Sequence, residues 1–323
     1  MTILITGGAG YIGSKVNHDL IKLGYKTVVI DNLSTGDKRL INKTSTFYNI
    51  DITNKEKLSQ IFKKHKFKTI FHFAAATNVV ESELQPEKYY INNVIGTENI
   101  LEELAKNKIK FFILSSTAAV YGNSKKVSFK ENSELTPRNN YGKTKLFSEI
   151  LTMNYAKLYK FKYVILRYFN VVGADEDLRS GQIAKGSLFK TLANNICNKR
   201  FHINIYGSNF HTKDRTALRD YIDVNDLSAI HILSFNKIKK NKSFIMNCGY
   251  NKPWSVKEIV KNFESCINRK INIKYLNKRQ GEVGAIYANN TFLKKQFPSW
   301  RQNKNLKDSI NLSILWEKRM NKY

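Results

Sequence analysis

The sequence predicts an α/β fold in which a doubly wound parallel sheet is joined to a smaller C-terminal α/β region. The first half alternates short apolar runs, rich in β-branched and aromatic residues, with stretches of helical periodicity, which is the pattern of successive βαβ units. After residue 170 the chain changes to a stretch rich in glycine, asparagine and charged residues, followed by shorter elements. The 323 residues suffice for one large domain and an attached smaller region.

The apolar runs are expected to be parallel strands covered on both faces, because they are short and nearly continuous in hydrophobicity. They cover residues 3–6, 27–31, 46–50, 69–73, 111–115 and 163–169. Helices are expected at residues 11–23, 55–65, 89–107 and 141–159. Gly24 is a suitable C-terminal cap for the first helix, and Asn54 is a suitable N-cap for the second.

The C-terminal region has weaker patterns. Residues 173–186 are expected to form a loop, and short strands are expected near residues 203–206, 220–223 and 271–275. We therefore expect one domain over residues 1–170, with a segment near 220–235 returning to it, and a second region over residues 171–323.

The charge and composition restrict the class of protein. The net charge is +28, which ordinarily suggests a nucleic-acid partner. The basic residues are spread in short runs along the whole chain, however, so we expect no nucleic-acid binding and only a weak attraction for anionic small molecules. With 42% hydrophobic and 12% aromatic residues the composition is that of a globular protein.

Targeting and metal-binding signals are not found in the sequence. No run of about 18 apolar residues occurs, and the first residues lack a basic segment and a cleavage site, so we expect no membrane association and a cytoplasmic location. Cys197, Cys248 and Cys266 are far apart and have no clustered histidines, so neither a metal site nor a disulfide framework is expected.

A glycine-rich loop lies between the first strand and the first helix. Gly7, Gly10 and Gly13 form the pattern G-x-x-G-x-x-G, with Tyr11 and Ile12 inside it. Glycines at the first two positions permit a tight turn and a close approach of backbone to a pyrophosphate at the helix N-terminus. The third glycine lets the helix pack closely on the strand. The loop predicts a dinucleotide site on a Rossmann-type sheet.

An acidic residue at the end of the second strand indicates which dinucleotide is bound. Asp31 can accept hydrogen bonds from both ribose hydroxyls and would repel a 2′-phosphate, which favours NAD over NADP. An alternative role for Asp31 is to cap the turn that follows. Asp51 and Ile52, after the third strand, are expected beside the adenine, and Phe73, Ala74 and Ala75, after the fourth, beside the pyrophosphate. Asn32, next to Asp31, is also expected to bind the cofactor.

A tyrosine and a lysine are spaced for proton transfer. Tyr141 and Lys145 are four residues apart in an expected helix and so share one of its faces. A phenol with a pKa near 10 must be shifted by about three units to act as a base at neutral pH, which takes roughly 4 kcal/mol. The ammonium of Lys145 and the positive ring of NAD⁺ can supply this in a desolvated pocket. Thr117, after the fifth strand, offers a hydroxyl to the same oxygen.

These residues resemble those of the extended short-chain dehydrogenase/reductase family and, within it, of the UDP-glucose 4-epimerases. The resemblance runs from Thr2 to about Asn289, nearly the whole chain. Besides the glycine loop and Tyr141 with Lys145, its characteristic stretches are Asp31-Asn32-Leu33, His72-Phe73-Ala74, Tyr89-Tyr90-Ile91-Asn92-Asn93, Val120-Tyr121-Gly122, Leu166-Arg167-Tyr168-Phe169-Asn170 and Leu218-Arg219-Asp220-Tyr221.

The resemblance implies an NAD-bound isomerase that interconverts UDP-glucose and UDP-galactose by transient oxidation at C4 of the sugar. In this reading Tyr141 is the acid/base, Lys145 assists it, and Thr117 and Ser115 occupy the hydroxyl positions. Asn92 and Tyr168 lie by the cofactor. The positions expected to hold the UDP-sugar are Asn170, Ser187, Leu188, Tyr206, Arg219, Arg279 and Glu282, and Thr117 contacts the sugar. The family also implies a homodimer formed through the helices at residues 89–107 and 141–159.

The chain departs from the family pattern at several positions. Thr77 stands where many of these enzymes have a lysine directed at the cofactor, which predicts weaker cofactor retention. Ser187 replaces a common asparagine, Glu282 a common aspartate, and Ile286 lies where a tyrosine or a small residue governs the room beside the sugar. The choice of sugar therefore stays open, with UDP-N-acetylhexosamine, UDP-galacturonate and UDP-pentose as alternatives.

Other activities on the same fold fit the sequence less well. A nucleotide-sugar dehydratase has an Asp-Glu pair directly after the threonine, where this chain has Ala118 and Ala119. A reductase using NADPH is disfavoured by Asp31, and a four-electron sugar dehydrogenase needs a cysteine nucleophile that no motif supplies. A non-catalytic NAD-sensing protein would not need the intact Tyr141 and Lys145. His72 is expected to be a core histidine.

Overall fold

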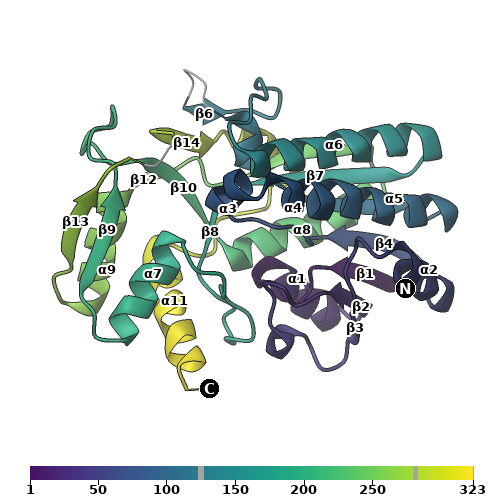
Figure 1. The fold of residues 1–323 in the computed structure, drawn as a ribbon, viewed down its shortest axis with the longest axis horizontal. Helices are drawn as coiled ribbons and strands as arrows, with labels where there is room; N and C mark the ends of the chain where they lie inside the picture. The colour runs from purple at the N-terminus through teal and green to yellow at the C-terminus, as the bar shows by residue number, and fades with distance from the viewer. Residues whose placement is uncertain (123–126, 279–282, 323) are drawn as a thin grey trace. The chain divides into compact units, whose positions relative to one another are not determined.

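The computed structural model describes residues 1–122, 127–278 and 283–322. The chain forms two compact units, each assembled from separate segments. Unit 1 comprises Met1–Asn123, Glu134–Tyr168 and Ser228–Met246. Unit 2 comprises Ser124–Ser133, Phe169–Leu227 and Asn247–Tyr323. Figure 1 shows the helices and strands of both.

Unit 1 is built on a sheet of seven strands in the order β11-β7-β5-β4-β1-β2-β3. The pairings of β1 with β2 and β4, of β2 with β3, and of β5 with β4 and β7 are parallel. The predicted α/β fold with a doubly wound parallel sheet is confirmed. The strands are β1 (Thr2–Thr6), β2 (Lys26–Asp31), β3 (Thr46–Asn49), β4 (Phe67–His72), β5 (Phe111–Thr117), β7 (Lys162–Tyr168) and β11 (Phe244–Cys248).

Helices cover both faces of this sheet. On one face α2 (Lys55–Lys64), α5 (Gly96–Lys106) and α6 (Asn140–Tyr159) lie over a core cluster that includes Leu4 and Phe112. Figure 1 shows α5 and α6 side by side. On the other face are α1 (Tyr11–Lys22) and the unit 1 part of α8 (Val224–Ile238). The aromatic rings of Phe71 and Phe235 lie 5.4 Å apart there.

The predicted helix ends of α1 and α2 are confirmed by their caps. Gly24 follows α1 with a φ of +82°, a conformation that glycine adopts without strain. The side chain of Asn54 accepts a hydrogen bond from the backbone N–H of Lys57 in the first turn of α2.

The helix predicted at residues 89–107 is not one regular α-helix. The segment consists of α4 (Pro86–Tyr89), a π-helical turn (Tyr90–Ile95) and α5. A π-turn inserts one residue more than an α-turn, and such turns occur frequently at functional sites. Here the turn contains Asn93, whose side chain bonds to the backbone of Ala76. The preceding short helix, α3 (Val79–Leu84), was not predicted.

Unit 2 has two smaller sheets. In the larger, β12, β10, β14 and β6 are neighbours in that order, and β8 pairs with β10. In the smaller, β9 and β13 are parallel. The strands are β6 (Ser128–Phe129), β8 (Asn170–Val172), β9 (His202–Tyr206), β10 (Leu218–Asp223), β12 (Pro253–Ser255), β13 (Asn272–Leu276) and β14 (Ala285–Ala288). The predicted strands near 203–206, 220–223 and 271–275 are confirmed, and the others were missed because each has only two to four residues.

The helices of unit 2 pack around an apolar core. Phe189, Tyr221 and Phe263 form its centre, with ring centroids of Phe189 5.4 Å from Tyr221 and 5.3 Å from Phe263. Residues 173–186 form the predicted loop, closed by a bridge between Ala174 and Gly181. The helices are α7 (Leu188–Cys197), α9 (Val256–Ile267), α10 (Thr291–Gln296) and α11 (Leu306–Met320). Within the described ranges, no helix has both the length and the apolar character required to cross a membrane.

Candidate active site

The glycine loop has the close packing that its pattern predicts. Gly7 has a φ of +72°, and a Cβ on it would lie 2.5 Å from the backbone nitrogen of Ala74. A Cβ on Gly13 would lie 2.3 Å from the carbonyl oxygen of Gly7. A Cβ on Gly10, in contrast, would meet only that same oxygen, at 3.3 Å. Any side chain at Gly7 would therefore force the loop away from the segment that follows β4, and any side chain at Gly13 would force it away from α1.

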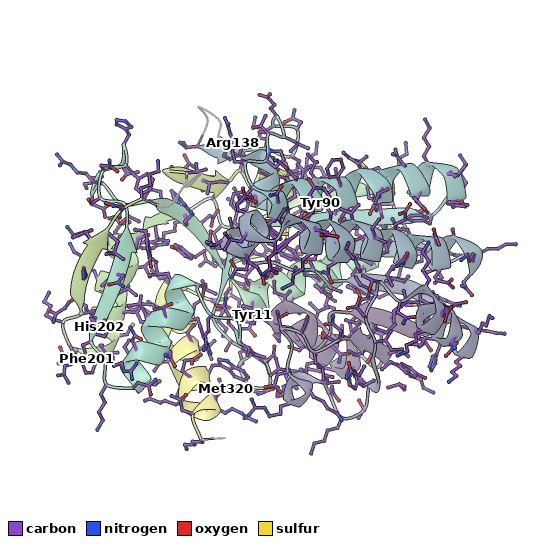
Figure 2. All side chains as sticks on the ribbon, viewed as in Figure 1. Tyr11, Tyr90, Arg138, Phe201, His202 and Met320 are labelled. Atoms are coloured by element: carbon purple, nitrogen blue, oxygen red, sulfur yellow. The ribbon has the colours of Figure 1, made fainter. Side chains whose placement is uncertain are left out.

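The start of α1 fits a pyrophosphate. The N-cap residue is Gly10, its position has no side-chain capping bond in the described structure, and the first turn contains no acidic residue. The helix begins at Tyr11, which Figure 2 labels. A helix N-terminus without a side-chain cap, preceded by the partly exposed glycines Gly7 and Gly10, presents N–H groups and a positive dipole end to an anion. Ile12 lies in this first turn.

Asp31 orders the glycine loop and can still accept further hydrogen bonds. Its Oδ2 accepts a bond of 2.9 Å from the backbone N–H of Ala9, and its Oδ1 accepts one of 2.8 Å from that of Leu33. Burial raises the pKa of this carboxyl, and the two backbone bonds oppose the rise. Each carboxylate oxygen has more than one acceptor site. Capping the turn and binding a ribose are thus compatible roles.

The segments that follow β2 and β3 are joined by a hydrogen bond between two side chains. The side-chain N–H of Asn32 donates to Oδ2 of Asp51 at 2.7 Å, and Thr53 donates to Oδ1 through both its N–H, at 2.8 Å, and its hydroxyl, at 2.7 Å. Burial alone would raise the pKa of Asp51, but these hydrogen bonds lower it overall. Ile52 is buried beside them. The structure therefore brings Asn32, a predicted cofactor residue, into contact with Asp51, which the sequence placed near the adenine.

Asn93 ties the segment after β4 to α6, a role that the sequence analysis missed. Its Oδ1 accepts from the backbone N–H of Ala76 at 2.7 Å, and its Nδ2 donates to the carbonyl of Ala76 at 3.0 Å and to the hydroxyl of Thr144 at 3.1 Å. Asn92, the predicted cofactor residue, donates to Oδ1 of Asn93 at 2.8 Å. Figure 2 labels Tyr90, the first residue of this π-turn. Two adjacent asparagines within a helix were the available signal, because asparagine is a poor helix former.

Thr117 and Tyr141 are brought together by β5 and α6. The hydroxyl of Thr117 lies near the phenol of Tyr141 and accepts a bond of 3.1 Å from the backbone N–H of Ala119. Side chains alternate along a strand, so Ser115 lies on the same face of β5 as Thr117, and Ser116 lies on the other. Ser115 and Thr117 are partly exposed, whereas Ser116 is buried.

The electrostatics around this pair are set mainly by burial. Burial raises the pKa of Tyr141, although its bond with Thr117 opposes the rise. Burial also lowers the pKa of Lys145 to about 8, and the charge of Glu149 opposes that fall. The groups of the chain alone therefore do not bring the pKa of Tyr141 toward 7. Additional positive charge is needed for a phenolate at neutral pH.

His72 is a core histidine, as the sequence analysis expected. It is fully buried, with Nδ1 2.6 Å from the hydroxyl oxygen of Thr6 and Nε2 3.0 Å from that of Thr97. Burial and the nearby charge of Lys145 lower its pKa to about 3, so the ring is neutral.

Tyr168, which was expected beside the cofactor, is buried at the end of β7. Its hydroxyl lies 2.6 Å from Nε2 of His231 on α8. Phe73 also contacts this histidine, with 5.2 Å between the ring centroids. Ala75 follows Phe73 in the partly exposed segment after β4. The Tyr168–His231 bond shows how β7 is attached to α8, and contact with a cofactor stays a prediction.

The residues expected to hold the nucleotide-sugar lie on separate elements of unit 2. Ser187 is the N-cap of α7, which begins at Leu188; its hydroxyl accepts from the N–H of Lys190 and donates to Gln182 at 2.7 Å. Arg219 lies on β10, where it is paired with Ile286 of β14 and donates to the carbonyl of Leu218 at 2.9 Å. The other positions are Asn170, exposed at the start of β8, and Tyr206, at the end of β9; Arg279 and Glu282 lie outside the described residues.

Comparison with known proteins places this geometry in a family. Residues 3–249 match the family described as NAD dependent epimerase/dehydratase. The chain belongs to that family. The resemblance inferred from the motifs is thereby confirmed, and with it the dinucleotide-dependent class of enzyme that the glycine loop predicted.

Individual relatives are similar over almost the whole chain. UDP-glucose 4-epimerase of Drosophila melanogaster is 35% identical, with 98% of this chain and 96% of the relative covered. Probable UDP-arabinose 4-epimerase 3 of Oryza sativa subsp. japonica is 33% identical, with 98% and 82% covered. A crystal structure of UDP-glucose-4-epimerase from Stenotrophomonas maltophila, with bound NAD and formylated UDP-arabinopyranose, has a TM-score of 0.93 at 27% identity and covers 100% of this chain and 99% of that one.

Proposed function

We propose that this protein is an NAD-dependent UDP-sugar 4-epimerase that interconverts UDP-glucose and UDP-galactose. The observation that carries the proposal is that Tyr141 lies near the hydroxyl of Thr117, with Lys145 buried one turn further along the same helix. This arrangement suits proton transfer to and from an alcohol. The relatives named above, which are 4-epimerases of UDP-sugars, support the same chemistry.

The residues of unit 1 fit NAD. Gly7, Gly10 and Gly13 leave room for a pyrophosphate at the start of α1, and Asp31 can accept the adenosine ribose. When bound by these residues, NAD would supply the hydride acceptor and hydride donor needed for oxidation and reduction at C4 of the sugar. We assign the remaining contacts to Tyr11, Ile12, Asn32, Asp51, Ile52, Phe73, Ala74, Ala75, Asn92, Tyr141, Lys145 and Tyr168.

Tyr141 is the proposed acid/base for the 4-hydroxyl. In this mechanism the phenolate of Tyr141 takes the hydroxyl proton when C4 is oxidised and returns it when C4 is reduced. Thr117 orients both oxygens through its hydroxyl, and Ser115 lies on the same face of β5 to assist. The ammonium of Lys145 stabilises the phenolate, which the burial of Tyr141 alone would disfavour.

UDP is proposed to bind through residues of unit 2. Arginine side chains such as Arg219 can hold a diphosphate with two parallel hydrogen bonds. Asn170, Ser187, Leu188, Tyr206 and Arg279 are assigned to the same nucleotide, and Glu282 to its ribose. With the binding energy concentrated on UDP, the hexose is held less tightly, so its oxidised form can turn over and receive hydride on the other face.

Two alternatives differ in how well they fit. A dehydratase needs an acid and a base after Thr117, and the side chains of Ala118 and Ala119 supply neither. A 4-epimerase for a UDP-pentose is the stronger alternative, because relatives of this chain include a probable UDP-arabinose 4-epimerase. Ile286, beside Arg219 on the neighbouring strand, is the position at which we expect the size of the sugar to be selected.

The reaction and the sugar can be tested together. The purified protein is incubated with NAD⁺ and, in parallel, with UDP-glucose, UDP-N-acetylglucosamine, UDP-galacturonate and UDP-arabinose, and the products are followed by NMR. We expect epimerisation at C4 of UDP-glucose without net formation of NADH. A faster reaction with another UDP-sugar would replace the proposed substrate, and net NADH or loss of water would refute the epimerase assignment.

The role of Tyr141 has its own test. Tyr141→Phe removes only the ionisable hydroxyl and should reduce turnover by at least about 10³-fold while UDP binding stays nearly unchanged. The control is Tyr159→Phe, at the exposed end of the same helix, which should keep wild-type turnover. If Tyr141→Phe kept more than about a tenth of wild-type turnover, Tyr141 could not be the acid/base of the reaction.

A homodimer is proposed through α6 and the segment that precedes α5. Large apolar side chains on these elements are exposed although such residues are usually buried: Ile91, Ile95, Phe147, Ile150 and Leu158. A second copy of the chain would cover them in an arrangement of four helices. Sedimentation should show a dimer for the wild type and a monomer for Phe147→Lys, and a monomeric wild type at micromolar concentration would exclude it.

A further inference from the structure

Behind the Thr117–Tyr141 pair lies a buried ion pair that the proposed mechanism does not use. Glu149 on α6 and Arg167 on β7 are both almost completely inaccessible to solvent. Nη2 of Arg167 donates to Oε2 of Glu149 at 2.7 Å, and its Nε donates to Oε1 at 3.0 Å. Nη1 of the same guanidinium donates to the hydroxyl of Tyr121 at 3.0 Å. A charged pair within an apolar sheet is costly to bury and adds little to stability by comparison with apolar residues.

This ion pair is attached to the strand that carries the catalytic hydroxyls. The hydroxyl of Ser116 donates to Oε1 of Glu149 at 2.5 Å. Ser116 is the residue between Ser115 and Thr117, on the opposite face of β5. Holding Ser116 against Glu149 therefore fixes how far Thr117 projects toward Tyr141, which lies on the same helix as Glu149.

The ion pair also faces the lysine of the proposed site. Lys145 and Glu149 are four residues apart on α6, so they lie on one face of the helix, and both are buried. The charged and titratable groups around them come from three further elements. His72 on β4 faces Lys145 and is neutral, while Arg167 and Tyr163 on β7 and the hydroxyl of Ser116 on β5 face Glu149.

We propose that Glu149, held by Arg167 and Ser116, is a positioning residue for the proposed 4-epimerase reaction, fixing β5 against α6 and placing a negative charge beside Lys145. Arg167 confines this charge, because it occupies both carboxylate oxygens. The expected effects on kinetics rest on the proposed 4-epimerase function, whereas the expected effect on the pKa of Lys145 does not. Neither the ion pair nor its bond to Ser116 follows from the roles assigned to Tyr141, Lys145 and Thr117.

Protonation of Lys145 supports this reading. Burial lowers the pKa of Lys145 to about 8, and the charge of Glu149 is what opposes a further fall. Without Glu149 the ammonium would lose its proton at lower pH. The phenolate of Tyr141 would then lack the cation that stabilises it at and above neutral pH.

The charge is tested with Glu149→Gln in the full-length protein. The alkaline limit of the kcat–pH profile, where Lys145 loses its proton, should move to lower pH by about one unit. The same shift should be seen in the titration of Lys145 by NMR of ¹³Cε-labelled lysine, with the signal assigned by its absence in Lys145→Met. A folded variant with wild-type values in both measurements would overturn the proposal.

Two further variants keep the test decisive. Glu149→Gln leaves Arg167 without its carboxylate partner. If this single variant does not fold, Glu149→Gln/Arg167→Gln is measured instead; its alkaline limit should move to lower pH by less than that of the single variant, because the positive charge of Arg167 is removed as well. Glu103→Gln is the matched control, since Glu103 is a buried acid of α5 paired with Lys106 at 3.2 Å. Its pH limits should equal those of the wild type, and a similar shift in this control would refute a specific role for Glu149.

The geometric half of the proposal is tested with Ser116→Ala. This change leaves Glu149 and Arg167 in place and removes the bond from β5. Turnover should fall about tenfold with little change in KM and in the alkaline limit, as expected for a misplaced hydroxyl at Thr117. Unchanged turnover would overturn the positioning of β5. If the wild type converts none of the UDP-sugars, the proposed function fails, while the lysine titration still decides whether Glu149 acts on Lys145.

Discussion

In unit 1 the buried carboxylate of Glu149 lies against the guanidinium of Arg167, whereas in unit 2 the buried carboxylates of Asp220 and Asp223 accept hydrogen bonds from neutral groups. Asp220 accepts from three backbone N–H groups, those of Tyr250, Asn251 and Ala288. Asp223 accepts from the hydroxyl of Ser309 at 2.5 Å and from the backbone N–H of Asn225 at 2.8 Å.

The difference changes how each unit responds to pH. Burial raises the pKa of both Asp220 and Asp223 to about 6, although the neutral donors oppose the rise. In unit 1 the charge of Glu149 is matched by that of Arg167, whose pKa is raised by the pair although burial alone would lower it. Unit 1 thus holds a compensated charge beside the proposed chemistry, whereas unit 2 holds acids that are costly to ionise.

The largest expected effect is on turnover, and it comes from replacing Lys145, the cation beside Glu149. Lys145→Met should lower turnover by about 10³-fold, because the phenolate of Tyr141 loses its stabilising charge. The control is Lys143→Met, two residues earlier on α6 and exposed, which should keep wild-type turnover. Steady-state kinetics with UDP-glucose measure both. Equal turnover in the two variants would show that Lys145 takes no part in the reaction. The charge held in unit 1 would then have no role in catalysis.

The next effect concerns the stability of unit 1. Arg167→Met leaves the carboxylate of Glu149 buried without its cation and should lower the free energy of unfolding by about 4 kcal/mol. Arg39→Met removes an exposed partner of Asp37 and should cost less than about 1 kcal/mol. Urea unfolding followed by circular dichroism gives both values. Similar losses of unfolding free energy in the two variants would mean that breaking the buried pair costs no more than breaking a surface pair.

In unit 2 we expect a smaller change in the free energy of unfolding, and it is a gain rather than a loss. The pKa of Asp223 is raised on folding, so its contribution to stability is complete below about pH 4 and is lost as the pH rises through about 6. At pH 8 the ionised Asp223 costs roughly 3 kcal/mol, and Asp223→Asn should recover most of it while leaving stability at pH 4 nearly unchanged. Asp177→Asn, at an exposed acid of the same unit, is the control. Parallel stability–pH curves for Asp223→Asn and the wild type would contradict the assignment.

The smallest effect concerns a helix cap in unit 2. The side chain of Ser255 accepts from the backbone N–H of Glu258, whose carboxylate accepts in return from the N–H of Ser255. Ser255→Ala should cost about 1 kcal/mol, with no dependence on pH between 5 and 8. If the loss of stability in Ser255→Ala varied over this pH range, the cap would be coupled to the buried acids Asp220 and Asp223. The pH response of unit 2 could then not be assigned to these two acids alone.

Much of unit 1 could be predicted because its signals are local. Strands with near-continuous apolar residues and the cap at Asn54 follow from short-range pattern and chemistry. The spacing of Tyr141 and Lys145 likewise predicts a shared helix face. The seventh strand, β11, was missed because a short edge strand that follows a long excursion of the chain has no distinctive pattern of its own.

The parts that were missed depend on contacts between distant elements. Glu149 and Arg167 are 18 positions apart, on a helix and a strand, so no periodicity joins them, although an arginine within the apolar run of β7 was a visible signal. Asn93 was missed because its partners Ala76 and Thr144 come from two other segments. The expected lowering of the pKa of Tyr141 was not found in the chain by itself, because burial dominates there.

The order in which unit 1 is assembled has a consequence for its synthesis on the ribosome. The rings of Phe71 and Phe73 are covered by Phe235 and His231 of α8, and the edge strand β11 follows α8 in the chain. A nascent chain that has emerged only as far as Tyr168 would expose this aromatic face and an unpaired edge at β7. Until another 78 or so residues are made, the growing chain is a natural client for chaperones that bind aromatic surfaces.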